Sequence, residues 1–101
     1  MIILNTTFFV PEHLAEELIC WVKETYFLSA INEGALTDPS MARLLDVPEE
    51  GMAGFAVQLL ARDIDFAKEW HDGRGGVLRS YLAERYPQEV LFFTTYMEKL
   101  V

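Results

Sequence analysis

The order in which strand-like and helix-like segments follow one another constrains the fold of this chain most strongly. Residues 2–10 are mainly β-branched and aromatic, and they predict a strand. Pro11 and Glu12 then stand where the first turn of a helix is expected, and from Leu14 apolar residues recur every three or four positions. This amphipathic pattern predicts a helix that ends near Gly34.

Two further strands are predicted in the middle of the chain. Residues 41–47 and residues 53–62 both read as strands, and the second run is the clearer one. Pro48 to Gly51 between them supply the composition of a turn. The two runs therefore predict a hairpin.

A second helix is predicted from Asp63, which can cap its first turn. Its apolar residues stay in phase at about 100° per residue across Gly73–Gly76. The preserved phase predicts one helix that is weakened or kinked at the glycines. Pro87 ends this helix, and residues 90–97 predict a last strand.

The order strand, helix, strand, strand, helix, strand is typical of the ferredoxin-like fold. In this α+β architecture (βαββαβ), both helices cover one face of a four-stranded antiparallel sheet. A chain of 101 residues is expected to form one such domain over residues 1–101. The aromatic side chains expected in its core are Trp21, Trp70 and Tyr81.

Alternation along the strands predicts which side chains lie on the uncovered face of the sheet, called the open face below. We place the more apolar sets under the helices, such as Phe55, Val57 and Leu59. The open face is then expected to carry Ile3, Asn5, Thr7, Phe9, Ala56, Gln58 and Leu60, together with Arg43. A face that is too apolar for water and too polar for a core predicts a homodimer with a partly polar cleft between two sheets.

Five side chains of this face are candidates for ligand binding. Amide and hydroxyl groups among apolar walls are typical of a small-molecule pocket, and we assign this role to Asn5, Thr7, Arg43, Gln58 and Thr95. Alternatively, these groups pair with one another across the dimer interface. Catalytic residues cannot be assigned. In a reaction, Arg43 would stabilise negative charge, and Asn5 or Gln58 would orient a carbonyl group.

The charge and composition of the chain exclude several kinds of partner. The net charge is −8, and residues 1–50 contain two basic and nine acidic residues. Because no basic stripe exists, we expect no binding to nucleic acid or to an anionic membrane. No stretch approaches the roughly 18 apolar residues of a membrane span. The single Cys20 allows no internal disulfide and suits a reducing compartment, so we expect a cytoplasmic protein.

The residues that most often carry chemistry do not form a recognisable motif. Cys20 and His13 lie roughly 10 Å apart along the predicted helix, and acidic neighbours disfavour a thiolate. Neither His13 nor His71 has a second ligand at metal-binding spacing, so we expect no metal. His71 and Asp72 are expected to form a surface pair.

The glycine segment Asp72–Gly76 matches neither nucleotide-binding fingerprint, and we expect no cofactor. Its backbone N–H groups could bind an anion. A close-packed or flexible bend in the helix is the favoured alternative.

Several short segments resemble a family of short bacterial proteins of unknown function. These segments are Ile2–Thr7, Trp21–Glu24, Gly34–Leu36, Ala42–Leu45 and Phe93–Glu98. The family is similar to the dimeric α+β barrel superfamily, which includes the antibiotic biosynthesis monooxygenases. The resemblance implies a ferredoxin-like fold and a dimer, but no activity. Many relatives have a His where this chain has Tyr26. The resemblance therefore does not imply a reaction that needs an imidazole at this position.

Two functions are compatible with these features. The first is a homodimeric small-molecule-binding or interaction protein, whose ligand would be an apolar small molecule. The alternative, by analogy of fold, is a cofactor-free oxygenase, isomerase or decarboxylase that acts on an apolar substrate in the sheet cleft. The predicted cleft offers no proton-transfer group beyond Tyr or Arg, which favours the first function.

Overall fold

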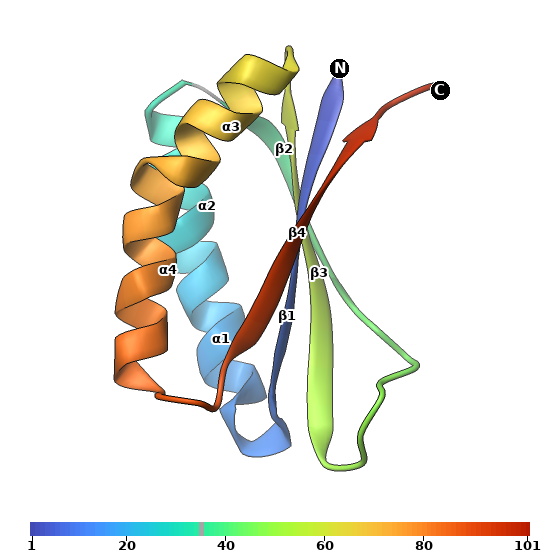
Figure 1. Cartoon of the computed structure of the whole chain (residues 1–101), viewed down its shortest axis with the longest axis vertical. Helices are drawn as coiled ribbons and strands as arrows, with labels where there is room; N and C mark the ends of the chain where they lie inside the picture. The colour runs from blue at the N-terminus through green and yellow to red at the C-terminus, as the bar shows by residue number, and fades with distance from the viewer. Residues whose placement is uncertain (35) are drawn as a thin grey trace.

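A computed structural model describes residues 1–34 and 36–101; Ala35, within the Gly34–Leu36 segment, lies outside the described residues. One antiparallel sheet has the order β2-β3-β1-β4, formed by β1 (Ile2–Pro11), β2 (Thr37–Arg43), β3 (Met52–Ala61) and β4 (Leu91–Glu98). Two helical regions lie on the same face of this sheet (Figure 1), and they contain α1 (Ala15–Trp21), α2 (Phe27–Asn32), α3 (Ile64–Asp72) and α4 (Arg74–Arg85). The predicted ferredoxin-like fold is confirmed.

The first helical region changes its pitch along its length. A 3-10 turn, η1 (Glu12–Leu14), precedes α1, and a π-helical turn, η2 (Val22–Tyr26), joins α1 to α2. The buried residues Leu18, Val22, Tyr26 and Ala30 recur every four positions. An α-helix has 3.6 residues per turn, so four residues rotate the chain about 40° beyond one full turn. Residues that recur every four positions would therefore drift around an α-helix and leave the buried face. The wider π turn reduces this drift and keeps Tyr26 directed at the sheet.

The second helical region is interrupted, not merely kinked, at Gly73. Gly73 separates α3 from α4 with φ −87° and ψ −104°. A Cβ atom on Gly75 would lie 2.9 Å from Cζ3 of Trp70 and 3.0 Å from Nη1 of Arg79, which is too close for non-bonded atoms. Gly75 is therefore needed for close packing, and this alternative for the glycine segment is confirmed.

The break at Gly73 explains one error in the predicted core. Tyr81 was expected to be buried, but its side chain is 63% exposed. Because α4 does not continue the phase of α3, it buries Leu78, Arg79 and Leu82 instead. Trp70 is buried as predicted, and Trp21 is half-buried.

Three strands lie within one residue of their predicted bounds, whereas β2 is displaced by four residues. It spans Thr37–Arg43 instead of residues 41–47, and it contains a bulge between Thr37 and Ser40. Asp38 within the bulge has a positive φ of 53°. The apolar residues after Arg43 misled the prediction, since Leu45 lies outside the sheet and is 93% exposed.

Candidate functional site

The open face is built from alternate residues of the strands. Asn5 is paired with Gln58 on β3 and with Thr95 on β4, so these three side chains share one face of the sheet. Leu4 and Phe8 occupy alternate positions on β1 and are buried in the core beneath the helices. The strand faces predicted for β1 and β3 are therefore correct.

A chain of hydrogen bonds crosses the centre of the open face. Nε2 of Gln58 donates to Oδ1 of Asn5 at 3.2 Å, and Nδ2 of Asn5 donates to Oγ1 of Thr7 at 3.1 Å. Asn5 and Thr7 are buried, while Gln58 is half-buried and Thr95 is exposed. The chain leaves the Oε1 acceptor of Gln58 at one end and the hydroxyl donor of Thr7 at the other.

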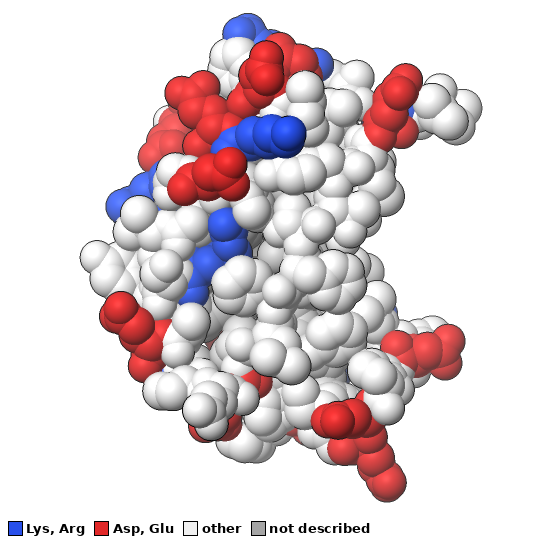
Figure 2. Space-filling view, viewed as in Figure 1, with Lys and Arg blue, Asp and Glu red and all other residues white. Residues whose placement is uncertain are grey.

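Among the described residues, those that the sheet registers place on the open face are all uncharged, while Asp38 in the β2 bulge has no register partner. The uncharged residues of the open face include the exposed Leu91 and Phe93 on β4. Figure 2 shows the side away from the helices as a hollow that is white over most of its length, with acidic side chains at both ends. The near absence of charged side chains from this hollow contrasts with the net charge of −8 of the whole chain.

Arg43 does not lie on the open face, so its predicted position is wrong. It is paired with Phe55, whose side chain is buried on the helix side of the sheet. The Arg43 guanidinium lies 4.8 Å from the Phe55 ring centroid, and its Nη1 lies 3.4 Å from Oε1 of Glu12. Arg43 alternates with Ala42, which takes the open-face position opposite Ala56.

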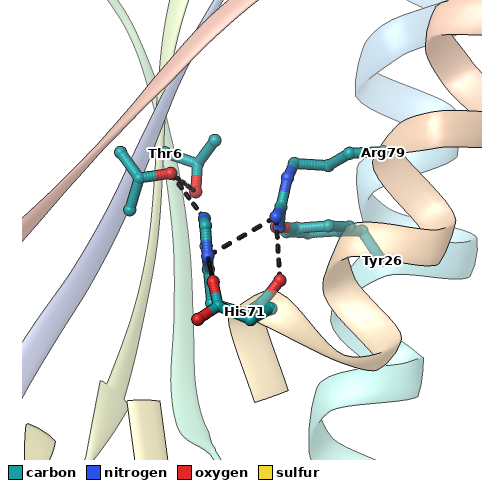
Figure 3. A network of polar contacts seen from close by, with 6 residues as sticks. Thr6, Tyr26, His71 and Arg79 are labelled. Carbon is teal, nitrogen blue, oxygen red and sulfur yellow. Dashed lines mark hydrogen bonds and ion pairs between the residues drawn. The ribbon is translucent and has the colours of Figure 1, made fainter. Parts of the chain in front are cut away.

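A second polar cluster lies between the sheet and the helices, and sequence analysis missed it. Figure 3 shows the cluster, called the His71 cluster below, where β1 and β4 face the helices. Its members are Thr6, Tyr26, His71, Asp72, Arg79 and Thr94. Nε2 of His71 lies 2.6 Å from Oγ1 of Thr94, and its Nδ1 lies 2.9 Å from Oδ1 of Asp72.

His71 was expected to form a surface pair with Asp72, but only Asp72 is at the surface. The imidazole side chain is 14% exposed and contacts Thr94 on β4. Burial lowers the pKa of His71, and the hydrogen bond to Asp72 opposes this effect in part. In the neutral imidazole, Nδ1–H donates to Asp72, so Nε2 accepts from the Thr94 hydroxyl. A carboxylate, an imidazole and a hydroxyl in this order can activate the hydroxyl as a nucleophile.

Arg79 is a buried cation that has neutral partners. The residue is only 6% exposed, and its Nη1 donates to the Tyr26 hydroxyl at 2.9 Å while Nη2 donates to the His71 carbonyl at 2.8 Å. Burial raises the pKa of Tyr26, and the charge of Arg79 opposes this rise. The nearby Phe92 ring has its centroid 5.7 Å from Cζ of Arg79. Neutral acceptors and an aromatic ring thus surround this guanidinium.

The larger cavities of the described residues lie outside both polar sets. One of about 430 Å³ is lined by residues of α3 and by the end of the first helical region, such as Trp70, Phe66 and Glu33. A smaller groove of about 240 Å³ lies beside Arg43. No three His, Cys, Asp or Glu side chains of the described residues are grouped so that they could hold a metal ion. None of the described helices combines the length and apolar character needed to cross a membrane.

These features define a ferredoxin-like domain with one uncovered, neutral sheet face. The chain belongs to the family described as "Domain of unknown function (DUF4286)", whose model matches residues 1–100. No curated protein matches it in sequence.

Solved structures share the fold at low sequence identity. A proposed antibiotic biosynthesis monooxygenase from Deinococcus radiodurans has a TM-score of 0.69 at 16% identity, over 100% of this chain and 94% of the other. A DABB family protein from Mesorhizobium loti has a TM-score of 0.57 at 23% identity, over 99% and 98%. A protein named as dimeric and ferredoxin-like, from an uncultured marine organism, has a TM-score of 0.58 at 11% identity, over 98% and 95%. These similarities agree with the ferredoxin-like fold expected from the sequence.

Proposed function

We propose that the protein is a cytoplasmic homodimer formed through the open face, and that the cleft between the two sheets binds an uncharged, apolar small molecule. The observation that carries this proposal is that every described residue placed on the open face by the sheet registers is uncharged, in a chain of net charge −8. A surface exposed to water normally mixes charged and polar groups with apolar ones. A neutral patch with exposed Leu91 and Phe93 is typical of an interaction surface.

The polar chain at the centre of this face suits a symmetric partner. Oε1 of Gln58 is a free acceptor and the Thr7 hydroxyl is a free donor. In two copies related by a two-fold axis, Thr7 of each copy can donate to Gln58 of the other. The neighbour named as dimeric supports the same assembly for this fold. Asn5, Thr7, Gln58 and Thr95 would then line the cleft, without Arg43.

Light scattering tests the dimer directly. We expect about twice the 11.6 kDa chain mass at micromolar concentration, and a single chain mass for Phe93→Glu, because this change places a charge in the interface. Tyr81→Glu is the matched control, since Tyr81 is also an exposed aromatic residue but lies on a helix. A wild-type monomer at high concentration would contradict the proposal, and so would an unchanged Phe93→Glu dimer.

Nile red, an uncharged apolar dye with a carbonyl group, tests the cleft. We expect its fluorescence to rise on binding to the dimer. Thr95→Val should keep the dimer and weaken dye binding severalfold, because only a hydroxyl group is lost. A dimer that does not bind the dye, or that binds it equally well after the substitution, contradicts the ligand-binding role.

The second candidate is a cofactor-free enzyme, and the hydrogen-bonded chain from Asp72 through His71 to Thr94 supports it. His71 would accept the Thr94 proton while the oxygen attacks an ester carbonyl, and it would return this proton to the alcohol that leaves as the ester bond breaks. This chemistry would lie on the helix side of the sheet, and not in the open-face cleft. Incubation with 4-nitrophenyl acetate should then acetylate Thr94, and His71→Gln should abolish the adduct. Wild-type protein without an adduct on Thr94 would exclude this role.

A further inference from the structure

A groove lies on the helix side of the sheet, where the first helical region faces β2. It has a volume of about 240 Å³ and is lined by Ile19, Lys23, Met41, Arg43 and Phe55. Ile19 and Lys23 are one turn apart on adjoining helical segments, and Met41 and Arg43 are alternate residues of β2. The groove therefore has an apolar floor and two basic side chains.

The two basic residues of the groove come from a part of the sequence that is otherwise acidic. Lys23 and Arg43 are the only Lys or Arg residues in the first fifty positions, which contain nine acidic residues. The fold brings these two residues, twenty positions apart, to the same groove. Together they favour a negatively charged group beside the apolar floor.

The acidic partner of Arg43 does not block this position firmly. Nη1 of Arg43 lies 3.4 Å from Oε1 of Glu12, and both side chains are substantially exposed. An exposed ion pair at this separation is weak, because water competes for both groups. A ligand carboxylate that also contacts Lys23 can replace Glu12.

We propose that this groove binds a free medium-chain carboxylate, with its alkyl chain on Ile19 and Met41 and its carboxylate between Lys23 and Arg43. The volume of about 240 Å³ corresponds to roughly eight water-sized groups at ~30 Å³ each. Octanoate is a chain of suitable size. The groove is on the opposite side of the sheet from the open face, so this site is independent of the proposed dimer.

Calorimetric titration with sodium octanoate at low ionic strength tests the site. Lys23→Gln combined with Arg43→Gln should weaken binding at least about tenfold, because two charge-assisted contacts are lost. Lys68→Gln combined with Lys99→Gln makes the same change in net charge away from the groove, and it should leave affinity unchanged. Glu12→Gln should tighten binding, because it frees Arg43. Circular dichroism confirms that each variant is folded.

Two comparisons separate this proposal from its alternatives. Octan-1-ol has the same chain without the charge, and it should bind at least about tenfold more weakly than octanoate. Equal affinity would overturn the proposal, and so would octanoate binding that the Lys23 and Arg43 substitutions do not change. Binding to phosphatidylglycerol vesicles without binding to octanoate would also overturn it, because the groove would then recognise a lipid surface.

Discussion

At the scale of single residues, His71 and Arg79 show how polar groups are accommodated in a small core. Arg79 donates to the Tyr26 hydroxyl and to the His71 carbonyl, so the cost of burying its charge is reduced by hydrogen bonds. His71 is held between Thr94 and Asp72, with its charged form disfavoured by burial. The contribution of His71 to stability therefore depends on its protonation state.

The lowered pKa of His71 predicts how stability depends on pH. The unfolded chain binds a proton near pKa 6.5, whereas the folded chain resists protonation until a lower pH. The His71 contribution is therefore complete above about pH 6.5 and is lost as pH falls toward the folded pKa, by at most ~1.4 kcal/mol per pH unit. Urea unfolding at several pH values and one protein concentration measures how steeply the free energy of unfolding changes with pH.

His71→Gln should flatten this slope between about pH 7 and 5.5 relative to the wild type. His13→Gln is the control, because the His13 side chain is 72% exposed and lies outside the His71 cluster. If both variants keep the wild-type slope, His71 does not titrate with folding.

At the scale of elements, the sequence predicted most of the sheet but not the breaks and bulges. Alternation of apolar and polar residues placed β1, β3 and β4 to within one residue, and it placed Asn5 and Gln58 on the open face correctly. The bulge in β2 and the break at Gly73 depend on backbone conformations that periodicity does not encode. The break at Gly73 is the reason why Tyr81 was wrongly placed in the core.

The His71 cluster could not be predicted for the same reason. His71 and Arg79 lie on different helices, and they meet only because the chain turns at Gly73. Tyr26 reaches them from the π-helical turn of the other helical region. A sequence pattern for one continuous helix gives no sign of this convergence.

Two adjacent glycines of α4 allow a matched test of packing. Gly75→Ala should destabilise the protein by about 1–3 kcal/mol, because its Cβ would overlap Trp70 and Arg79. Gly76→Ala should be neutral or stabilise by up to ~1 kcal/mol, since its nearest contacts are 3.5 and 3.7 Å and Ala favours a helix. Urea unfolding measures both changes. Equal effects of the two substitutions would show that Gly75 does not provide this close packing.

At the scale of the whole molecule, the two faces of the sheet differ in their chemistry. The helix side contains the core, the His71 cluster and the groove beside Lys23 and Arg43. The open face combines neutral apolar side chains with one chain of hydrogen bonds. A second copy on the open face would leave the helix side accessible, so the proposed dimer and the proposed carboxylate site can coexist.

A single substitution at the centre of the open face tests whether this face forms the dimer interface. Gln58→Glu should raise the dimer dissociation constant at least about 100-fold, because the two-fold interface would bury two carboxylates, each beside the Asn5 carbonyl oxygen of its own copy. Gln88→Glu is the control, since it makes the same change at an exposed position outside the sheet. Sedimentation equilibrium measures both constants. Lowering the pH should restore the Gln58→Glu dimer as the carboxylate takes up a proton, whereas equal dissociation constants at neutral pH would show that this face is not the interface.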